Sequence, residues 1–504
     1  MKHVVVVDVG TQSLRAIIYT HQGEQIVVSQ LQYSPIFNWI EVEQDPRTFK
    51  DSLYGTLKDV NQYAREQKID IGHIAVTSQR ASIIPVDKNG KVLYNSITWQ
   101  DRRSYEEVDV VTKRMSMKDI YQRTGLRLDS YFSAPKMMWL KRNRSEIYES
   151  AHKIIGVQDY VIYLLTGRFV TDSTQAARTL LMNIHTFEWD DELIDVFGIN
   201  KDLLCEIVKP GSIVGTLSSS LIEKTGLEKH VEVVIAGGDQ QCAAVGLNVL
   251  RPGTLEANIG TGSFIIAYSE KPAFDENMRI LCSASAVADQ WIVEAGLLTS
   301  GAIYTWYKDN FYRNGDGEVS YDLINQEVMD AKPGSNGLVF IPHFKGSAAP
   351  YWNPLSKGVF FNAAFDHKRG DFARSVLEGI AMEMAQNIEL IENTVGYVDI
   401  IHAAGGLTKF PTFNQIQSDI FNKAVSVYSS AEATALGALI TTLVTLKKYK
   451  THADAFEALL GKAEKKTYHA NPKNIYTYKK LIRTKKLLYQ ALNDSQIYNY
   501  MTLK

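Results

Sequence analysis

A strand, a glycine turn and a second strand follow one another near the start of this chain, and the pattern returns in its second half. Residues 4–19, VVVVDVGTQSLRAIIY, place four valines before Asp8, a Gly-Thr turn after it and then another apolar run. Residues 254–270, TLEANIGTGSFIIAYSE, repeat this order, with Asn258 at the position of the aspartate. Two matched hairpins of this kind predict a duplicated α/β domain, each copy presenting one Gly-Thr turn.

Length and charge agree with two domains that act on a small molecule. The chain has 504 residues, whereas single cores stop growing at roughly 250–300 residues. From the repeat we predict one domain over 1–244 and another over 245–504. The formal net charge is −2, so no basic field indicates nucleic acid or an anionic membrane as a partner.

Cysteine usage and hydropathy indicate the compartment. Cys205, Cys242 and Cys282 are far apart and form no CxxC pair, which argues against a disulfide framework and a structural zinc site. No apolar run approaches the ~18–20 residues of a membrane span, and the N-terminus does not read as a signal peptide. We therefore expect a cytoplasmic protein.

Local patterns predict several elements. Residues 4–9, 14–19 and 25–33 read as an antiparallel meander. Asp45 is a plausible N-cap, and Pro46 suits the first position of the helix that follows. Further buried strands are expected at 74–77 and from Val231. A third glycine turn, within 402–420, precedes another helix.

The Gly-Thr turns can handle phosphate. Glycine lets successive backbone N–H groups approach an anion, Thr11 and Ser13 add hydroxyl donors, and Asp8 can hold Mg²⁺ directly or through water. An ordinary hairpin explains one such turn equally well. Two matched turns favour a nucleotide site between the halves. GxxxxGK[ST] is absent, so the chain has no P-loop, and the turns join strands instead of opening helices, which disfavours a dinucleotide fold.

Two further stretches can carry chemistry. Residues 236–241, AGGDQQ, end a buried strand at Asp239, which suits either a general base or a helix cap. Within 77–104, Arg80 and Trp99 can line a polar pocket with an aromatic wall, although Trp99 suits the core equally well. For Arg102 and Arg103 we expect surface ion pairs.

Taken together, these motifs resemble the FGGY carbohydrate kinases, within the sugar kinase, Hsp70 and actin superfamily. DVGTQSLRA resembles the first phosphate motif, NIGTGSF the second, and AAGGLTKFPTFNQIQSDI the adenosine motif. YFSAPKMMWLKRN, with Lys136 and Trp139, and APYWNP are similar to two other family segments. The five stand in the family's order along nearly the whole chain.

The resemblance implies two ribonuclease-H-like (actin-like ATPase) domains around a deep catalytic cleft, ATP and Mg²⁺ as cofactors, and phosphorylation of a sugar or polyol. It makes Asp239 the catalytic base and Asp8 the carboxylate associated with the metal. Dimers are common in this family, so a homodimer is compatible with it. By motif match, the phosphates and nucleotide would contact Thr11, Ser13, Arg15, Gly260, Thr261, Gly301, Gly405 and Gly406.

Several stretches are most similar to glycerol kinases within this family. Ala81, however, replaces the glutamate that follows the arginine there, and Phe410 replaces an asparagine near the nucleotide. Losing a carboxylate that binds hydroxyls redirects specificity. We therefore expect a primary hydroxyl of a small linear ketose or polyol to be phosphorylated (a pentulose such as xylulose, a pentitol or a tetritol), with glycerol as the alternative. The residues that match the polyol contacts are Arg80, Trp99, Tyr131, Asp239, Gln240 and Phe264.

Two alternatives belong to other classes. A superfamily ATPase without a sugar substrate would lack the polyol matches. A sugar-binding regulator without kinase activity would not need both Asp8 and Asp239.

Overall fold

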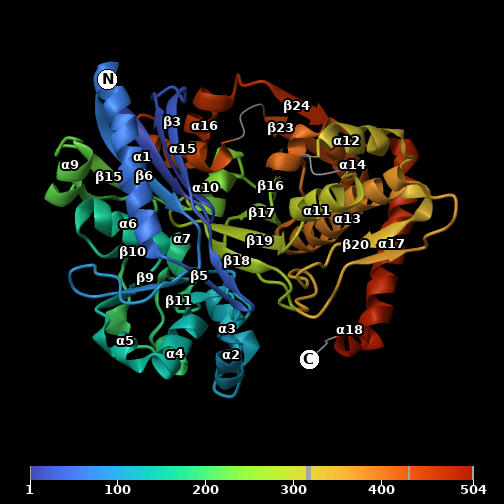
Figure 1. The fold of residues 1–504 in the computed structure, drawn as a ribbon, viewed down its shortest axis with the longest axis horizontal. Helices are drawn as coiled ribbons and strands as arrows, with labels where there is room; N and C mark the ends of the chain where they lie inside the picture. The colour runs from blue at the N-terminus through green and yellow to red at the C-terminus, as the bar shows by residue number, and fades with distance from the viewer. Residues whose placement is uncertain (1, 314–318, 429–431, 502–504) are drawn as a thin grey trace.

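Two mixed β-sheets, one in each half of the chain, organise the computed structural model, which describes residues 2–313, 319–428 and 432–501 (Figure 1). The first sheet has the strand order β14–β15–β6–β1–β2–β3. Its strands are β1 (His3–Val9), β2 (Ser13–Tyr19), β3 (Gln25–Gln32), β6 (Ile71–Ser78), β14 (Ile213–Thr216) and β15 (Glu232–Gly238).

The predicted meander is confirmed. β1 pairs antiparallel with β2, placing Asp8 opposite Arg15, and β2 pairs antiparallel with β3. On the other side, β1, β6 and β15 run parallel, so their carboxyl ends meet at one edge of the sheet. This edge collects Asp8, the residues after Ser78 and the residues after Gly238.

The second sheet repeats this arrangement. β16 pairs antiparallel with β17, which pairs with β19, while β16, β22 and β23 are parallel. Because a central strand, an antiparallel hairpin partner and two parallel strands recur, the predicted duplication is confirmed. The strands in spatial order are β18 (Leu281–Ala284), β19 (Trp291–Leu297), β17 (Ser263–Ser269), β16 (Thr254–Ile259), β22 (Ile400–Ala404), β23 (Ala424–Tyr428) and β24 (Lys465–Tyr468).

Helices cover both faces of each sheet. One face of the first sheet packs on α1 (Pro46–Glu66) and α6 (Val157–Thr166) through alternate valines of β1. α1 begins as predicted, with Asp45 accepting a hydrogen bond from the Arg47 backbone N–H. One face of the second sheet packs on α13 (Arg369–Val395) and α14 (Pro411–Phe421).

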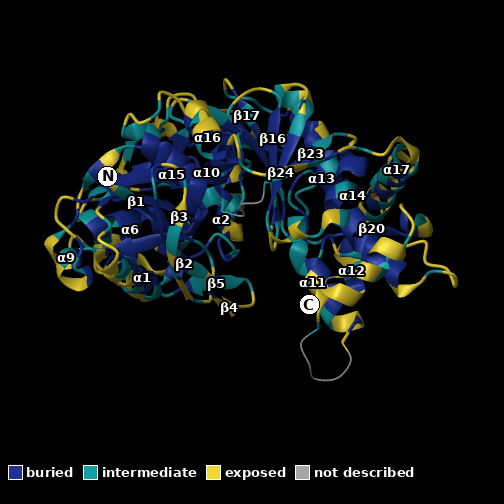
Figure 2. Cartoon of the chain, turned by 90° about the horizontal axis from the view of Figure 1, so that it is seen from above, coloured by how far each residue is buried: buried dark blue, intermediate teal, exposed yellow. Residues whose placement is uncertain are grey.

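Between the two sheets lie α10 (Asp239–Gly246) and α15 (Ala433–Thr445), with α16 (His452–Leu460) beside them (Figure 1). α15 packs on the first sheet although it comes late in the chain, contacting the other face of β1 near Val4 and Val6. α10 and α15 cross with backbones nearly touching: a Cβ added to Gly437 would lie 1.7 Å from the Cys242 carbonyl oxygen. The centre of the molecule is accordingly dark with buried residues in Figure 2.

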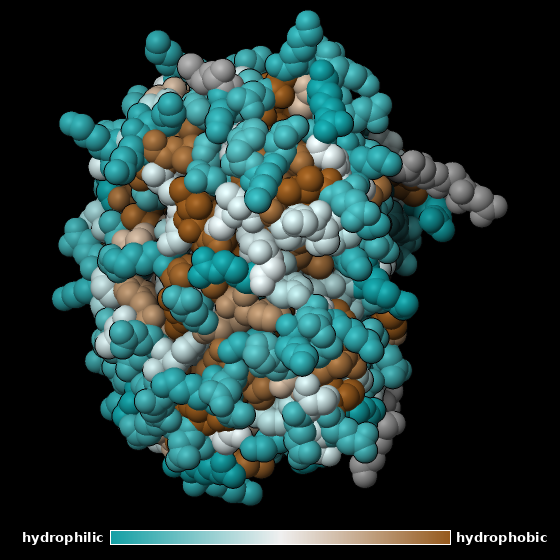
Figure 3. Space-filling model, turned by 90° about the vertical axis from the view of Figure 1, so that its left-hand side faces the viewer, coloured by the Kyte–Doolittle hydropathy of each residue, from teal (hydrophilic) through white to brown (hydrophobic). Residues whose placement is uncertain are grey.

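The outer face of the N-terminal half is mostly hydrophilic, with scattered apolar side chains (Figure 3). Among the described helices, none combines the length and hydrophobicity needed to cross a bilayer.

Small strands complete the fold: β4 (Ile36–Asn38), β5 (Glu41–Gln44), β7 (Ile84–Val86), β8 (Ser96–Ile97), β9 (Lys153–Ile155), β10 (Val170–Asp172), β11 (Met182–Asn183), β12 (Glu188–Trp189), β13 (Glu206–Val208), β20 (Val339–Ile341) and β21 (Val359–Phe361). The remaining α-helices are α2 (Tyr105–Thr112), α3 (Met117–Thr124), α4 (Ser133–Asn143), α5 (Ser145–Ser150), α7 (Ser173–Ala176), α8 (Asp191–Phe197), α9 (Ser219–Thr225), α11 (Gly301–Phe311), α12 (Tyr321–Asp330), α17 (Pro472–Asp494) and α18 (Ile497–Tyr500).

Candidate active site

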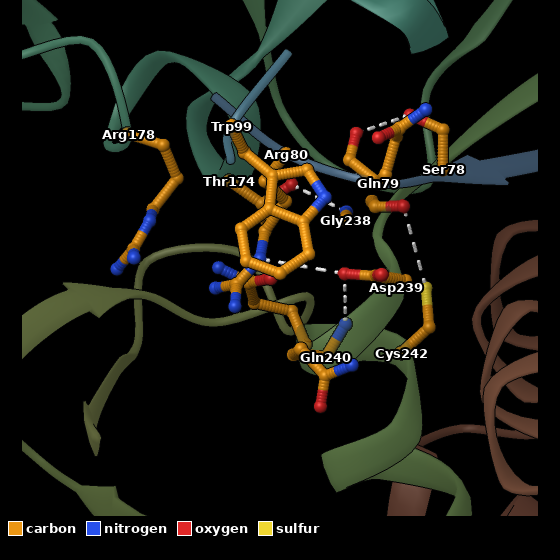
Figure 4. A network of polar contacts seen from close by, with 12 residues as sticks. Ser78, Gln79, Arg80, Trp99, Thr174, Arg178, Gly238, Asp239, Gln240 and Cys242 are labelled. Carbon is orange, nitrogen blue, oxygen red and sulfur yellow. Dashed lines mark hydrogen bonds and ion pairs between the residues drawn. The ribbon is translucent and has the colours of Figure 1, made fainter. Parts of the chain in front are cut away.

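Asp239 stands where β15 ends and α10 begins (Figure 4). Its Oδ1 accepts a hydrogen bond from the backbone N–H of Gln240 at 2.7 Å and lies 3.4 Å from Nε of Arg80. Burial raises the pKa of this carboxyl above its ordinary value, and the Arg80 charge opposes the rise. About a quarter of the side chain (24%) stays exposed, so the carboxylate is accessible to a substrate hydroxyl.

A buried ion cluster supports Arg80, and sequence reasoning missed two of its members. Arg80 donates to Glu294 in β19 at 3.0 Å, and Arg178 donates to the other oxygen of the same carboxylate. All three residues are at least 95% buried. Burial and the nearby Arg80 charge lower the pKa of Arg178 to about 9. The sequence does offer one sign of a role for Glu294, since it is the charged residue within the otherwise apolar strand WIVEAGL.

An aromatic wall stands beside this cluster. The rings of Trp99 and Tyr131 lie 5.7 Å apart, and the guanidinium of Arg80 lies 5.9 Å from the ring centre of Phe264. Trp99 is only partly buried, and its Nε1 donates to the hydroxyl of Thr11 at 3.1 Å. Trp99 therefore lines the site instead of filling the core, and it links the wall to the first Gly-Thr turn.

The two predicted turns occupy matching places in their sheets but differ in length: four residues separate the paired Val9 and Leu14, and three separate the paired Ile259 and Ser263. The backbone N–H of Gly10 donates to the Ser13 carbonyl at 2.9 Å, and that of Gly260 donates to the Gly262 carbonyl at 2.9 Å. Each turn follows the central strand of its sheet. Gln79, after β6, lies beside the first turn, its amide 3.5 Å from the Gly10 carbonyl oxygen.

Arg15 bridges two carboxylates. It donates to Asp8 at 2.5 Å and, through its other terminal nitrogen, to Glu432 at 2.5 Å. Glu432 precedes α15 and is a third residue that sequence reasoning missed. Arg15 holds only one oxygen of the buried Asp8 carboxylate.

The donor set around Asp8 fits Mg²⁺. Mg²⁺ in kinase sites is held by one or two carboxylates together with phosphates and water, and Asp8, of which Arg15 holds one oxygen, supplies such a carboxylate. Among the described residues, no group of three or more His, Cys, Asp or Glu side chains could form an all-protein cage. The site thus suits a metal that arrives with nucleotide phosphates.

Four predicted nucleotide glycines, Gly260, Gly301, Gly405 and Gly406, lie together beyond the strand ends of the second sheet. A Cβ on Gly301 would lie 2.5 Å from the Gly260 carbonyl oxygen, and one on Gly405 would lie 2.3 Å from that of Ile259. Gly405 also has φ +98°, which glycine adopts at low cost. Gly406 starts a short 3₁₀ turn, and a Cβ there would meet nothing within 4 Å, leaving open space beside the turn.

Lys136 is completely buried near the start of α4. Its Nζ donates to the carbonyl oxygens of Ala81 at 3.3 Å, Phe132 at 3.2 Å and Tyr131. Burial lowers the pKa of this ammonium to about 7, although nearby carboxylates favour its charged form. Ala81, with φ +62°, also borders a small cavity of about 30 Å³, which is lined by Ser82, Met137 and Gln175 among others and by none of the residues of the aromatic wall.

The expectation of surface ion pairs holds for Arg102 and is wrong for Arg103. Arg102 is partly exposed and pairs with Asp129. Arg103 is buried, pairs with Asp101 and Glu43, and stacks 4.8 Å from the Trp139 ring centre. Its buried position follows from packing against α4, which the local pattern does not encode.

Comparison with known proteins places this geometry in a family. The model of the N-terminal domain of FGGY carbohydrate kinases matches residues 3–246, and that of the C-terminal domain matches residues 255–446. The chain is 29% identical to a gluconokinase of Bacillus subtilis (strain 168), over 92% of this chain and 91% of the relative. It is 33% identical to a glycerol kinase of Thermococcus onnurineus (strain NA1), over 87% and 88%.

Among solved structures, the ligand-bound xylulose kinase of Lactobacillus acidophilus superposes with a TM-score of 0.91 at 25% identity, covering 100% of both chains. Such neighbours have the two-domain actin-like ATPase fold, which confirms the expected fold class. FGGY kinases use ATP and Mg²⁺ to phosphorylate sugars and polyols. The protein described here belongs to the FGGY family of carbohydrate kinases.

Proposed function

We propose that this carbohydrate kinase transfers the γ-phosphoryl group of ATP to a primary hydroxyl of a small linear sugar or polyol, with Asp239 as the general base. The position of Asp239 carries the proposal: a partly exposed carboxylate with a raised pKa lies beside Arg80 and the aromatic wall. A base whose pKa rises toward the working pH accepts a proton more effectively.

Phosphoryl transfer depends mainly on positioning and charge neutralisation. On the sugar side, Arg80, Trp99, Tyr131, Gln240 and Phe264 would hold the substrate so that its hydroxyl faces Asp239. Arg80, fixed by Glu294, keeps the Asp239 carboxylate in place until it takes the proton.

On the nucleotide side, the amides and hydroxyls of the two turns would contact the phosphates. Asp8 would hold Mg²⁺, which, when bound, neutralises charge on the phosphate oxygens. The residues that we assign to the nucleotide are Thr11, Ser13, Arg15, Gly260, Thr261, Gly301, Gly405 and Gly406.

Ala81 favours a substrate other than glycerol. With alanine after Arg80, the pocket lacks the carboxylate that would bind glycerol hydroxyls, and the shorter side chain occupies less volume than a glutamate would. We favour a pentulose such as xylulose, a pentitol or a tetritol. The similarity to a xylulose kinase supports this choice.

Gluconate is the second candidate, and the charge balance supports it. Two arginines, Arg80 and Arg178, face two carboxylates, Asp239 and Glu294, so this cluster of four ion-paired side chains is formally neutral. A glutamate at position 81 would make it negative and would repel an anionic substrate. A relative of similar length is a gluconokinase.

A coupled assay of ADP release tests the proposal. We would supply glycerol, erythritol, pentitols, xylulose, ribulose, fuculose, rhamnulose and gluconate one at a time, with ATP and Mg²⁺. Saturable ADP release with a pentulose, pentitol, tetritol or gluconate is the expected result. Release that is equal with and without every compound would favour an ATPase, and saturation by micromolar glycerol would refute the preference against it. The boundary at 244/245 and a homodimer stay predictions.

A further inference from the structure

We propose that Lys136 is a positioning residue that clamps together the two segments that carry Arg80 and Tyr131, and so sets the shape of the sugar pocket. The inference rests on the proposed function, since both segments line the pocket assigned to the sugar. Lys136 itself is completely buried and does not line the aromatic wall.

The geometry of the ammonium carries the proposal. An ammonium has three N–H donors, and Lys136 has three carbonyl acceptors: Ala81 on one segment, and Tyr131 and Phe132 on the other. Ala81 follows Arg80 directly, and Tyr131 is one of the two residues of the wall. Each carbonyl thus belongs to a residue that lines the pocket or adjoins one that does.

The two segments come from different parts of the fold. Residues 79–83 connect β6 to β7, whereas residues 131–132 lead into α4, with Phe132 as its N-cap. Ala81 has φ +62°, a conformation that a residue with a Cβ adopts only when its surroundings hold it. The hydrogen bond from Lys136 to the Ala81 carbonyl is one contact that holds it.

Burial of an ammonium is costly unless its donors are satisfied, and a methionine of similar length fits an apolar site better. The same helix also carries a lysine in the usual, exposed environment. Lys141, also on α4, is exposed and donates to the Gly198 carbonyl at 2.6 Å. A charge at position 136 is therefore not explained by the stability of α4, but it is explained by the need to hold the two segments in one geometry.

The test compares Lys136→Met with Lys141→Met, which removes a lysine–carbonyl contact from the same helix without touching the pocket. With the substrate that the ADP-release panel identifies, we expect K136M to raise the KM for that substrate at least tenfold. We expect kcat to fall less than threefold and ADP affinity to change less than twofold. K141M should leave all three within twofold of the parent protein. A purely structural role would instead lower the active fraction, and hence the apparent kcat, at unchanged KM.

Hydrogen exchange of backbone amides needs no substrate. It therefore tests the role of Lys136 even if the ADP-release panel identifies no substrate. In K136M, amides in peptides covering 79–82 and 129–133 should exchange at least fivefold faster, while peptides of β16 and β17 stay unchanged. Lys136→Gln retains two donors and should give intermediate values in both assays. Unchanged exchange in 79–82 and 129–133 would overturn the proposal. Faster exchange along the whole chain in both K136M and K136Q would also overturn the proposal, because this result would show a general structural role for Lys136.

Discussion

The indole Nε1 of Trp99 donates a hydrogen bond to the hydroxyl of Thr11, 3.1 Å away. One residue belongs to the aromatic wall and the other to the first Gly-Thr turn. The contact therefore joins the proposed sugar side directly to the proposed phosphate side, within the N-terminal half.

Trp99→Phe keeps an aromatic ring and removes this donor. A net hydrogen bond is worth about 1 kcal/mol, so we expect KM for both ATP and the sugar to rise roughly fivefold. Steady-state kinetics with each substrate varied in turn would measure this. Thr11→Val should have a similar effect, and the double variant should be less than additive. A rise in the sugar KM alone would show that the contact does not couple the two sides.

Asp239→Asn removes the proposed base and keeps the shape of the side chain. We expect kcat to fall by about 10²–10⁴, the usual contribution of a general base, with ATP affinity nearly intact. Single-turnover kinetics and calorimetric titration with ATP measure the two quantities. A kcat close to that of the parent protein would refute the assignment.

Ala81→Glu restores a carboxylate after Arg80. The pocket then gains a hydroxyl acceptor and a negative charge, so kcat/KM for glycerol should rise at least tenfold and that for gluconate should fall. Ala81→Gln, of the same size but neutral, separates the two effects: it should leave any activity on gluconate less impaired. If A81E and A81Q lowered kcat/KM for gluconate by the same factor, the charge argument would be contradicted.

A buried triad in the C-terminal half predicts acid sensitivity. Burial alone would raise the pKa of Glu383, but Lys485 and His343 outweigh it and hold that pKa at about 2. Because the folded pKa lies below the ordinary value of 4.5, the stabilisation is complete above about pH 4.5 and is lost as the pH falls toward 2.

Glu383→Gln should therefore lower the free energy of unfolding by about 3–5 kcal/mol at pH 7, since it leaves the Lys485 ammonium unpaired. Its stability should also vary less between pH 4.5 and 2 than that of the parent protein. Urea denaturation at several pH values would test both. Parallel pH curves for the two proteins would show that Glu383 does not titrate on unfolding in this range.

Gly437→Ala tests the close crossing of α10 and α15. The added Cβ would lie 1.7 Å from the Cys242 carbonyl oxygen, so the helices must move apart, at a cost of about 1–3 kcal/mol or more. Since Asp239 is the first residue of α10, kcat should fall as well as Tm. Gly167→Ala is the control: its φ is +78°, yet its Cβ would meet nothing within 4 Å, so only Tm should fall.

Much of this architecture is predictable because it is local. The Gly-Thr hairpins, the cap at Asp45 and the placement of Asp239 at a strand end follow from residues next to one another in the sequence. The short strand before Trp99 is harder to predict, since β8 covers only Ser96–Ile97 and pairs with β5 at these two residues.

The ion cluster was not predictable in the same way. Arg80, Arg178 and Glu294 are separated by about a hundred residues each, and no spacing rule connects them. Likewise, Glu432 reaches Arg15 only because α15 lies against the first sheet. These contacts depend on how the halves pack, which one sequence does not reveal.

That packing makes the two halves mutually dependent. A fragment ending at Gly246 would leave the apolar face of β1, with Val4 and Val6, without the helix that covers it, since α15 lies beyond residue 432. The two duplicated halves are thus joined by α15, a helix of the second half that packs on the sheet of the first half. Each half keeps a core of its own on the outer face of its sheet, but the inner face of the first sheet is covered only when both halves have folded.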